Sequence, residues 1–380
     1  MLSIALLTLL GAAQDPKPHA APAKPQNEFN PTITVFSDAL WRIDNKDVVE
    51  VEDGEIIAKD DTFLLREVEI DFRAAIDPYA DGVVVLAAHQ EVPGEYEMDI
   101  EEGYVRIKSL PFGPWEEPPL GTRIKVGRFL TAVGRQNRLH THDLPQPQRG
   151  LTYGQFIGEH PFIGNGASAE MFLPLDLQFT FEALQGGGWE LAENGTERPQ
   201  FVGNLAWFTT VADEHDLEVT GIATYGSNDE EGRRQVQLLS LDVLYAWRPA
   251  RGGEARSLVV AGQVFYGSGE FEEDTDGDDI IDLTGRNRGF GYFAYAQYHL
   301  DRRWYVGVRY DWTEYLGDRA RDVARITPYL TCYVSEFFRL RVAYEFTSSD
   351  VEEDDDLHTF LFQVTAIFGT HPAHPYWANH

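Results

Sequence analysis

The chain has 380 residues, 43% of them hydrophobic and 13% aromatic, which is sufficient for one large domain. Its formal net charge of −31 argues against nucleic acid as a partner, because a polyanion is repelled by an acidic surface. The single cysteine, Cys332, excludes an intrachain disulfide, and no run reaches the roughly 18 apolar residues of a membrane-spanning helix.

The first residues resemble a secretory signal. Residues 1–13 are apolar, carry no ionisable side chain and end in Gly-Ala-Ala, which predicts a signal peptide cleaved near Ala13. A buried N-terminal strand is the alternative. Residues 14–31 are rich in Pro, Ala and Lys, which favours an exposed periplasmic leader after the cleavage site.

From residue 32 to residue 369 the sequence alternates as β-strands do. The clearest segment, 304–313, has Trp, Val, Val, Tyr and Trp on one face and mostly small or charged residues on the other. An apolar face with aromatic residues at both ends is typical of a strand in an outer-membrane barrel, where it meets lipid while the polar face lines water. The sequence therefore predicts an all-β fold, a transmembrane antiparallel β-barrel.

About sixteen segments follow this pattern. In chain order they span approximately residues 32–44, 62–76, 82–90, 96–110, 122–130, 166–173, 175–184, 201–211, 216–225, 236–247, 256–267, 288–300, 304–315, 324–335, 337–347 and 357–368. The connections alternate between short turns and longer acidic loops, as periplasmic turns and external loops do, with exceptions at 92–95 and 111–121. A soluble β-sandwich or propeller also alternates and is the alternative, although no repeat of about 40–50 residues supports a propeller.

The longest connection, residues 131–165, follows the fifth segment. A loop of this length in a compact domain is usually functional, and its aromatic, Pro, Gly and His content is not that of a disordered segment. Its candidate functional residues are Arg135, Arg138, His140, His142, Asp143, Glu159 and His160. The imidazoles of this loop, and those of His371 and His374 near the C-terminus, are also candidates to hold zinc or copper.

A local motif, Gly-Arg-Phe-Leu-Thr-Ala-Val-Gly-Arg at 127–135, runs from a strand into this loop. With the sixteen segments and the leader, it resembles the general porin superfamily of Gram-negative outer membranes, and most nearly its phosphate-selective branch. The resemblance implies that residues 131–165 form a constriction loop inside the barrel and that the chain is a homo-oligomer, a trimer. It does not carry over phosphate preference, which in that branch rests on lysine and arginine arrays, whereas this chain is acidic with few lysines. Residues 360–368 resemble the terminal assembly signal of porins, followed here by a tail, residues 370–380.

Charged residues on the water-facing side of the strands are candidates to line a pore. By parity, the basic candidates are Arg73, Arg123, Lys125, Arg309, Arg339 and Arg341, and the acidic ones are Glu67, Glu69, Asp71, Asp176, Glu182, Asp242, Asp311 and Glu345. In porins, basic groups that face acidic groups of the constriction loop create a transverse field that orients solutes. Internal ion pairs that stiffen the wall are the alternative.

An acidic segment at 274–282 resembles a calcium loop. Its candidate ligands are Asp274, Asp276, Asp278 and Asp282, which surround a glycine turn at spacings that suit the oxygen ligands of Ca²⁺. Position 12 is Gly285 rather than the Glu of an EF-hand, so a solvated acidic loop is the alternative.

These features predict an outer-membrane channel for passive diffusion of small hydrophilic solutes or ions, in contact with outer-membrane lipid. The acidic loops favour cations or neutral solutes. No nucleophile elbow, P-loop or dinucleotide motif is present, so we expect no enzyme and no required cofactor. Two alternatives remain open: a barrel plugged by residues 131–165 with a structural or binding role, and a secreted soluble β-protein that binds calcium and glycans.

Overall fold

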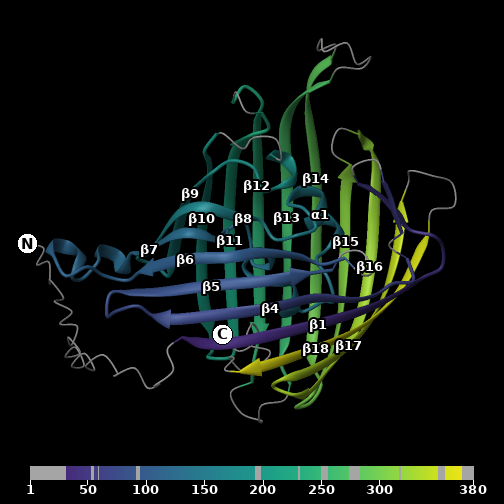
Figure 1. Ribbon diagram of the computed structural model, residues 1–380, viewed down its shortest axis with the longest axis horizontal. Helices are drawn as coiled ribbons and strands as arrows, with labels where there is room; N and C mark the ends of the chain where they lie inside the picture. The colour runs from purple at the N-terminus through teal and green to yellow at the C-terminus, as the bar shows by residue number, and fades with distance from the viewer. Residues whose placement is uncertain are drawn as a thin grey trace, which may run out of the picture.

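Sixteen strands form one closed barrel in the computed structural model of the protein (Figure 1). The structure describes residues 31–369, apart from 53–54, 59, 91–94, 193–197, 230–231, 250–255, 274–282, 316–317 and 350–355. The predicted signal peptide (1–13), nearly all of the leader, the calcium candidates and the tail lie outside these residues. The predicted all-β, sixteen-stranded antiparallel barrel is confirmed.

The strands correspond one to one with the predicted segments. They are β1 (Thr32–Asp44), β4 (Phe63–Ala75), β5 (Ala80–His89), β6 (Glu97–Ile107), β7 (Arg123–Leu130), β8 (Ile163–Leu173), β9 (Leu177–Leu184), β10 (Gln200–Val211), β11 (His215–Ser227), β12 (Gln235–Trp247), β13 (Leu258–Glu273), β14 (Leu283–His299), β15 (Trp304–Tyr315), β16 (Asp318–Ser335), β17 (Phe338–Ser349) and β18 (Leu357–Gly369). Each pairs antiparallel with its neighbours, and β1 pairs with β18 to close the barrel.

The remaining elements lie in the connections. β2 (Val49–Glu52) and β3 (Glu55–Ala58) pair as a separate hairpin in the loop after β1. Within the long connection between β7 and β8 stands α1 (Leu151–Phe156). Short 3-10 turns occupy Gly113–Trp115, Pro119–Gly121, Gln136–Arg138, Thr141–Asp143 and Glu190–Ala192. Among the described residues, no helix is long and apolar enough to cross a bilayer.

The two faces of each strand divide as the sequence predicts. In β15, Trp304 and Val308 point outward and are about two-fifths exposed, whereas Arg309 and Asp311 point into the lumen and are fully buried. The pattern continues around the wall, because most of the exposed large hydrophobic residues within strands lie on the outward parity, from β1 to β18. The outer face of the barrel is therefore largely apolar, whereas the inner face carries both polar and apolar side chains.

One predicted strand begins too early. Leu175 and Asp176 lie in the tight turn between β8 and β9, with φ of 69° and 57°, and β9 begins only at Leu177. Asp176 is exposed in this turn, so its prediction as a pore-lining residue is wrong. Alternation alone could not separate the turn from the strand, because the turn residues continue the apolar–polar pattern.

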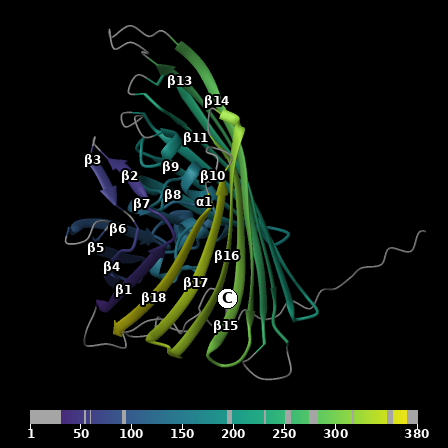
Figure 2. The same cartoon turned by 90° about the vertical axis from the view of Figure 1, so that its right-hand side faces the viewer.

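Opposite walls of the barrel cross at a large angle. In Figure 1, β4, β5 and β6 run almost horizontally across the front, while β10 to β14 stand upright behind them. Strands of a closed barrel tilt by about 35–45° from its axis, so the front and back walls slope in opposite directions. Helix α1 and the chain around it lie between the walls (Figures 1 and 2).

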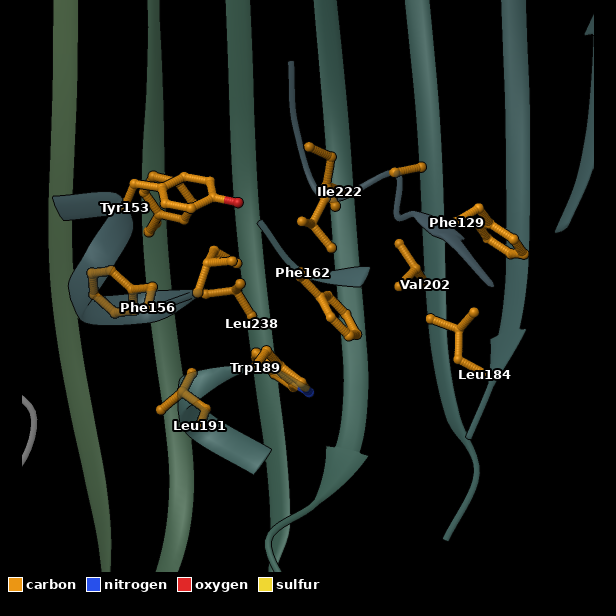
Figure 3. Packing of buried hydrophobic residues seen from close by; sticks show 14 of the residues in the cluster. Phe129, Tyr153, Phe156, Phe162, Leu184, Trp189, Leu191, Val202, Ile222 and Leu238 are labelled. Atoms are coloured by element: carbon orange, nitrogen blue, oxygen red, sulfur yellow. The ribbon is translucent and has the colours of Figure 1, made fainter. Parts of the chain in front are cut away.

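An apolar core fills part of the lumen. Tyr153, Phe156 and Phe162 from the β7–β8 connection pack with Trp189 and Leu191 in one buried cluster (Figure 3). Inward side chains of the wall complete the cluster, among them Val202, Ile222, Leu238, Phe265 and Phe293. On this side the barrel is packed like the interior of a globular protein, a feature that the alternation of apolar and polar residues does not predict.

The outward apolar face generates a stability prediction. Val308→Arg places a charge at the middle of β15, and we expect it to lower the free energy of unfolding in lipid by about 2–4 kcal/mol. Met98→Arg, at the second residue of β6, is the control. Its charge can reach water, so it should lower the free energy of unfolding by only about 0–1 kcal/mol. Urea titration in vesicles, followed by tryptophan fluorescence, measures both. Equal effects of the two substitutions would contradict a lipid-facing surface at Val308.

Candidate functional site

The connection between β7 and β8, residues 131–162, folds into the barrel, and we call it the lumen loop. Its first part runs along β9 to β13. The amide of Ala132 donates to Glu182 (2.9 Å) and that of Arg135 to Asp242 (2.9 Å). The Gln263 amide donates to the carbonyl of Val133 (2.9 Å). These bonds hold the loop backbone against the wall.

The second part of the lumen loop is held by arginines of the opposite wall. Arg341 donates to the carbonyl of Leu144 (2.9 Å), and Arg309 donates to that of Gln148 (2.7 Å). Arg339 donates to the carbonyl of His142. All three arginines were predicted to line the pore, and all three point inward but are buried under the loop. They anchor the loop backbone and do not face an open aperture.

A single asparagine closes the base of the lumen loop. The Asn137 amide donates to the carbonyls of Thr131 (2.9 Å) and Phe162 (3.0 Å), the first and last residues of the loop. Its carbonyl oxygen accepts from the Phe162 amide (2.7 Å) and from the Tyr153 hydroxyl. Asn137 is fully buried, so these four bonds replace water and fix the two ends of the loop to each other.

Two glycines of the 127–135 motif lie where the backbone and its neighbours leave no room for a side chain, Gly127 within β7 and Gly134 in the lumen loop. Gly127 has a φ of 137°, and a Cβ there would lie 2.8 Å from Tyr104 Cα on the neighbouring strand. Gly134 has a φ of 138°, and a Cβ there would lie 2.5 Å from the Gln263 amide that anchors the loop. Both positions lie in the region that favours glycine, so the motif has a backbone role at this site.

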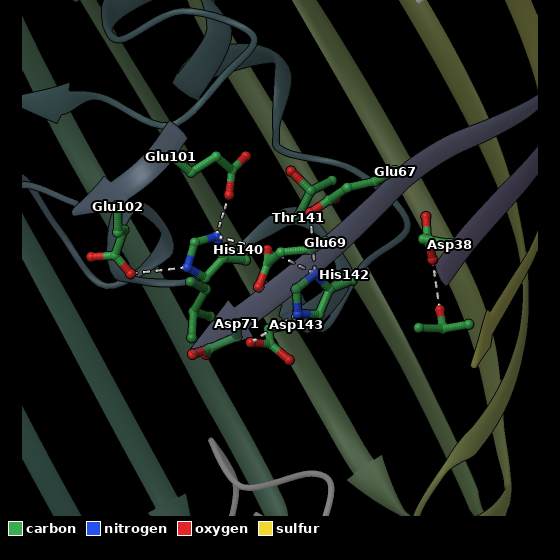
Figure 4. Close-up of polar contacts among 12 residues, drawn as sticks. Asp38, Glu67, Glu69, Asp71, Glu101, Glu102, His140, Thr141, His142 and Asp143 are labelled. Atoms are coloured by element: carbon green, nitrogen blue, oxygen red, sulfur yellow. Dashed lines mark hydrogen bonds and ion pairs between the residues drawn. The ribbon is translucent and has the colours of Figure 1, made fainter. Parts of the chain in front are cut away.

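The loop histidines meet an acidic wall. His140 Nδ1 lies 2.7 Å from Glu101 and its Nε2 lies 3.1 Å from Glu102, both on β6. His142 Nδ1 lies 3.2 Å from Glu67 on β4. Glu69, also on β4, lies between the two rings, 3.2 Å from His140 Nδ1 and 3.6 Å from His142 Nδ1 (Figure 4). We call these four glutamates and two histidines the carboxylate–imidazole cluster.

Electrostatics set the charge of the two rings. Burial lowers the pKa of His142, but the carboxylates of Asp143, Glu69 and Glu67 outweigh it and raise the pKa to about 9. Burial likewise opposes a charge on His140, and Glu69, Glu101 and Glu102 raise its pKa well above the ordinary value. The surrounding carboxylates therefore favour the charged form of both rings, which draws the loop toward β4 and β6.

Beside this cluster lies a basic cavity. It has a volume of about 210 Å³ and is enclosed by the lumen loop and strands β6 to β9. Its lining residues are Arg106, Arg123, Lys125, Leu130, Ala132, Arg138, Ser168, Glu170, Thr180 and Glu182. Arg123, at the first residue of β7, is half exposed and lies 3.6 Å from Glu170, which places this side of the cavity at the short-turn end of the barrel.

Three further carboxylates that were predicted to line the pore are paired with other residues. Asp311 bonds to Arg309 (2.7 Å), Glu345 accepts from Gln148 of the loop (2.8 Å), and Asp71 pairs with Arg73 (2.6 Å). These are internal ion pairs and loop contacts, the alternative that the sequence left open.

Two predicted loop residues do not join the site. Glu159 and His160 are exposed near the start of β8, and His160 lies beside His89 (6.1 Å between ring centroids). The three loop histidines therefore do not form one group. The second histidine pair, His371 and His374, and the calcium candidates Asp274, Asp276, Asp278 and Asp282 lie outside the residues that the structure describes.

Sequence reasoning missed Glu101 and Glu102. Strict alternation allows only one of two consecutive residues to point inward, yet both are buried in the lumen. The pairing of β5 with β6 shifts here, because Val85 is opposite Glu102 while Leu86 is opposite Ile100. This β-bulge gives Glu101 no partner on β5 and turns its side chain inward. A bulge has no clear sequence signature, so only the structure could reveal it.

Comparison with known proteins identifies the fold. No protein-family model matches the chain. An uncharacterized protein of Aquifex aeolicus (strain VF5) is 26% identical over 363 residues, which covers 86% of this chain and 72% of that protein. The anion-selective porin from Comamonas acidovorans has a TM-score of 0.58 at 10% identity, over 89% of this chain and 99% of the porin.

The outer membrane channel DcaP of Acinetobacter baumannii has a TM-score of 0.57 at 11% identity, over 89% of this chain and 96% of the channel. At such low identity the likeness shows the fold alone, a closed barrel like that of porins. The nearer resemblance to the phosphate-selective branch stays a prediction.

The bonds of Asn137 generate a prediction about the lumen loop. Asn137→Ala leaves the buried Phe162 amide and Tyr153 hydroxyl without a partner, at a cost of about 1–3 kcal/mol for each group. We expect the loop to leave the wall more often and trypsin to cleave after Arg138 several-fold faster, which mass spectrometry of timed digests measures. Gln155→Ala on α1 is the control and should digest at the rate of the unmodified chain. Unchanged cleavage in Asn137→Ala would contradict the role of Asn137 as the closure of the loop.

Proposed function

We propose that the protein is an outer-membrane channel for small hydrophilic solutes, in which the lumen loop sets the narrowest point. The observation that carries this proposal is the position of residues 131–162. They cross the lumen of a closed sixteen-stranded barrel and leave a solvent-accessible basic cavity against one wall. An apolar outer face with aromatic residues suits lipid, and a polar inner face suits water. The absence of enzymatic activity is part of the same proposal.

We further propose that the channel prefers anionic solutes. Arg106, Arg123, Lys125 and Arg138 line the cavity against only two carboxylates, Glu170 and Glu182. Arg138 is exposed at the cavity, and its side chain makes no hydrogen bond with a described residue. The acidic external loops led us to expect a preference for cations or neutral solutes, but charge at the narrowest point acts on a partly desolvated ion and has the larger effect. The anion selectivity of the Comamonas acidovorans porin supports this direction.

Location and assembly follow from the same proposal. We infer insertion in the outer membrane of a Gram-negative bacterium and association as a homo-oligomer, because solved structures of this fold include outer-membrane proteins and a trimeric form. The outward apolar strands would then meet either lipid or a second copy of the chain.

A plugged, binding barrel is the second candidate. The lumen loop bonds to strands on both walls, and the apolar cluster fills the lumen on the side of β10 to β14. If the cavity does not continue through the barrel, the protein would bind a ligand without conducting.

Conductance separates the two candidates. We expect the full chain, purified in detergent, to give stepwise conductance in planar bilayers and an anion-selective reversal potential in a salt gradient. Arg138→Glu removes one positive charge from the cavity and adds a negative one, so it should shift the reversal potential toward cation selectivity. Arg302→Glu makes the same charge change at an exposed turn outside the cavity and is the control.

Two outcomes would contradict the proposal. A folded barrel that gives no conductance steps would favour the plugged candidate. Steps whose selectivity responds equally to Arg138→Glu and Arg302→Glu would contradict the cavity as the selective region.

A further inference from the structure

We propose that the carboxylate–imidazole cluster is a binding site for a divalent transition-metal ion, which fastens the lumen loop to the barrel wall. The candidate ligands form two overlapping triads: Glu67, Glu69 and His142, and Glu69, Glu101 and His140. In each triad the ligand atoms lie within 4.8 Å of one another, and Glu69 belongs to both. This inference does not depend on the proposed channel function, because it concerns binding and not transport.

The spacing of the ligand atoms suits a metal ion. A tetrahedral site with bonds of about 2.1 Å places neighbouring ligand atoms about 3.4 Å apart. Glu69 lies 3.2 Å from His140 Nδ1 and 3.6 Å from His142 Nδ1, and Glu67 lies 3.2 Å from His142 Nδ1. The 3.6 Å separation is too long for a hydrogen bond, yet it fits two ligands of one ion.

A buried oxygen without a partner points to the same position. Glu69 is only 1% exposed, and its Oε2 makes no hydrogen bond, although it faces the Nδ1 atoms of both rings. A buried carboxylate oxygen without a hydrogen bond is costly unless a cation lies beside it. An ion beside Oε2 would take that place and replace the proton on each Nδ1, because a histidine binds a metal only as the neutral ring.

The orientation of the His140 ring also supports a metal. Its Nδ1 faces Glu69 and Glu101, while its Nε2 lies 3.1 Å from Glu102. When one nitrogen of a histidine binds a metal, the other usually donates its N–H to a carboxylate, which fixes the ring and strengthens the ligand. Glu102 is in the right place for this role as a positioning residue.

The chemistry of the ligand set favours a divalent transition metal. Glu67, Glu69, Glu101 and Glu102 bring four carboxyl groups into a buried space beside the imidazoles of His140 and His142. A mixed set of imidazole and carboxylate ligands suits zinc, manganese or iron(II) better than calcium, which prefers oxygen ligands alone.

Metal binding by the full-length barrel in detergent tests the inference. After dialysis against chelator, we expect the chain to bind one or two equivalents of Zn²⁺ in calorimetric titration, and to show the visible absorption of nitrogen-ligated Co²⁺ when cobalt is used as the probe. Glu69→Gln should weaken Zn²⁺ binding more than about 100-fold, and Glu102→Gln by about 10–100-fold. Glu159→Gln, an exposed carboxylate of the same loop, is the control and should bind as the unmodified chain does.

The fold of each variant is checked separately. Far-UV circular dichroism shows whether Glu69→Gln retains the barrel, and His140→Ala provides a second ligand variant if it does not. A folded chain that binds no Zn²⁺, or binds it equally with and without Glu69 and His140, would overturn the inference. Loss of conductance with metal binding intact would count only against the channel, so the two proposals fail separately.

The effect on the loop gives an independent readout. If the ion fastens the loop, chelator should speed trypsin cleavage after Arg138 several-fold in the unmodified chain, and Zn²⁺ should restore the slow rate. The Glu69→Gln chain should digest at the same rate with and without Zn²⁺. A cleavage rate in the unmodified chain that chelator does not change would contradict the fastening role.

Discussion

The interior of the barrel depends on the contact between the lumen loop and the inward polar face of the strands. That face carries buried arginines and carboxylates, and buried polar groups are costly unless each finds a partner. The loop supplies backbone carbonyls for Arg309, Arg339 and Arg341 on one wall and amides for Glu182 and Asp242 on the other. Hydrogen bonds between the loop backbone and the wall side chains thus give buried polar groups their partners. These bonds hold the loop inside the barrel.

The two sides of the lumen serve different purposes. Toward β10 to β14 the loop packs through Phe156 and Phe162 into an apolar core, which fixes its height in the barrel. Toward β4 to β9 the interior also holds the charged groups of the carboxylate–imidazole cluster and the basic cavity beside it. Acidic and basic side chains therefore lie next to each other in the lumen. In the proposed channel, the packed side gives rigidity and the polar side gives selectivity.

Much of this arrangement could be predicted from the sequence. The sixteen strands, the outward apolar face and the inward parity of Arg309, Asp311 and Glu345 follow from a period of two residues, since a strand buries or exposes alternate side chains. Position and length also indicated that residues 131–165 are functional. The role of the arginines could not be predicted, because parity shows which way a side chain points but not whether a loop or water meets it. Asp176 was misplaced because a turn continued the pattern of its strand.

The sequence by itself determined the strands and their faces, because these depend on the two-residue period of a strand. Only the tertiary structure decided that Glu67 and Glu69 on β4, Glu101 and Glu102 on β6 and two loop histidines share one buried site. That convergence depends on the tilt and closure of the barrel, and on a bulge that turns two consecutive glutamates inward. These are non-local features, because each arises from how distant strands pair rather than from any one segment.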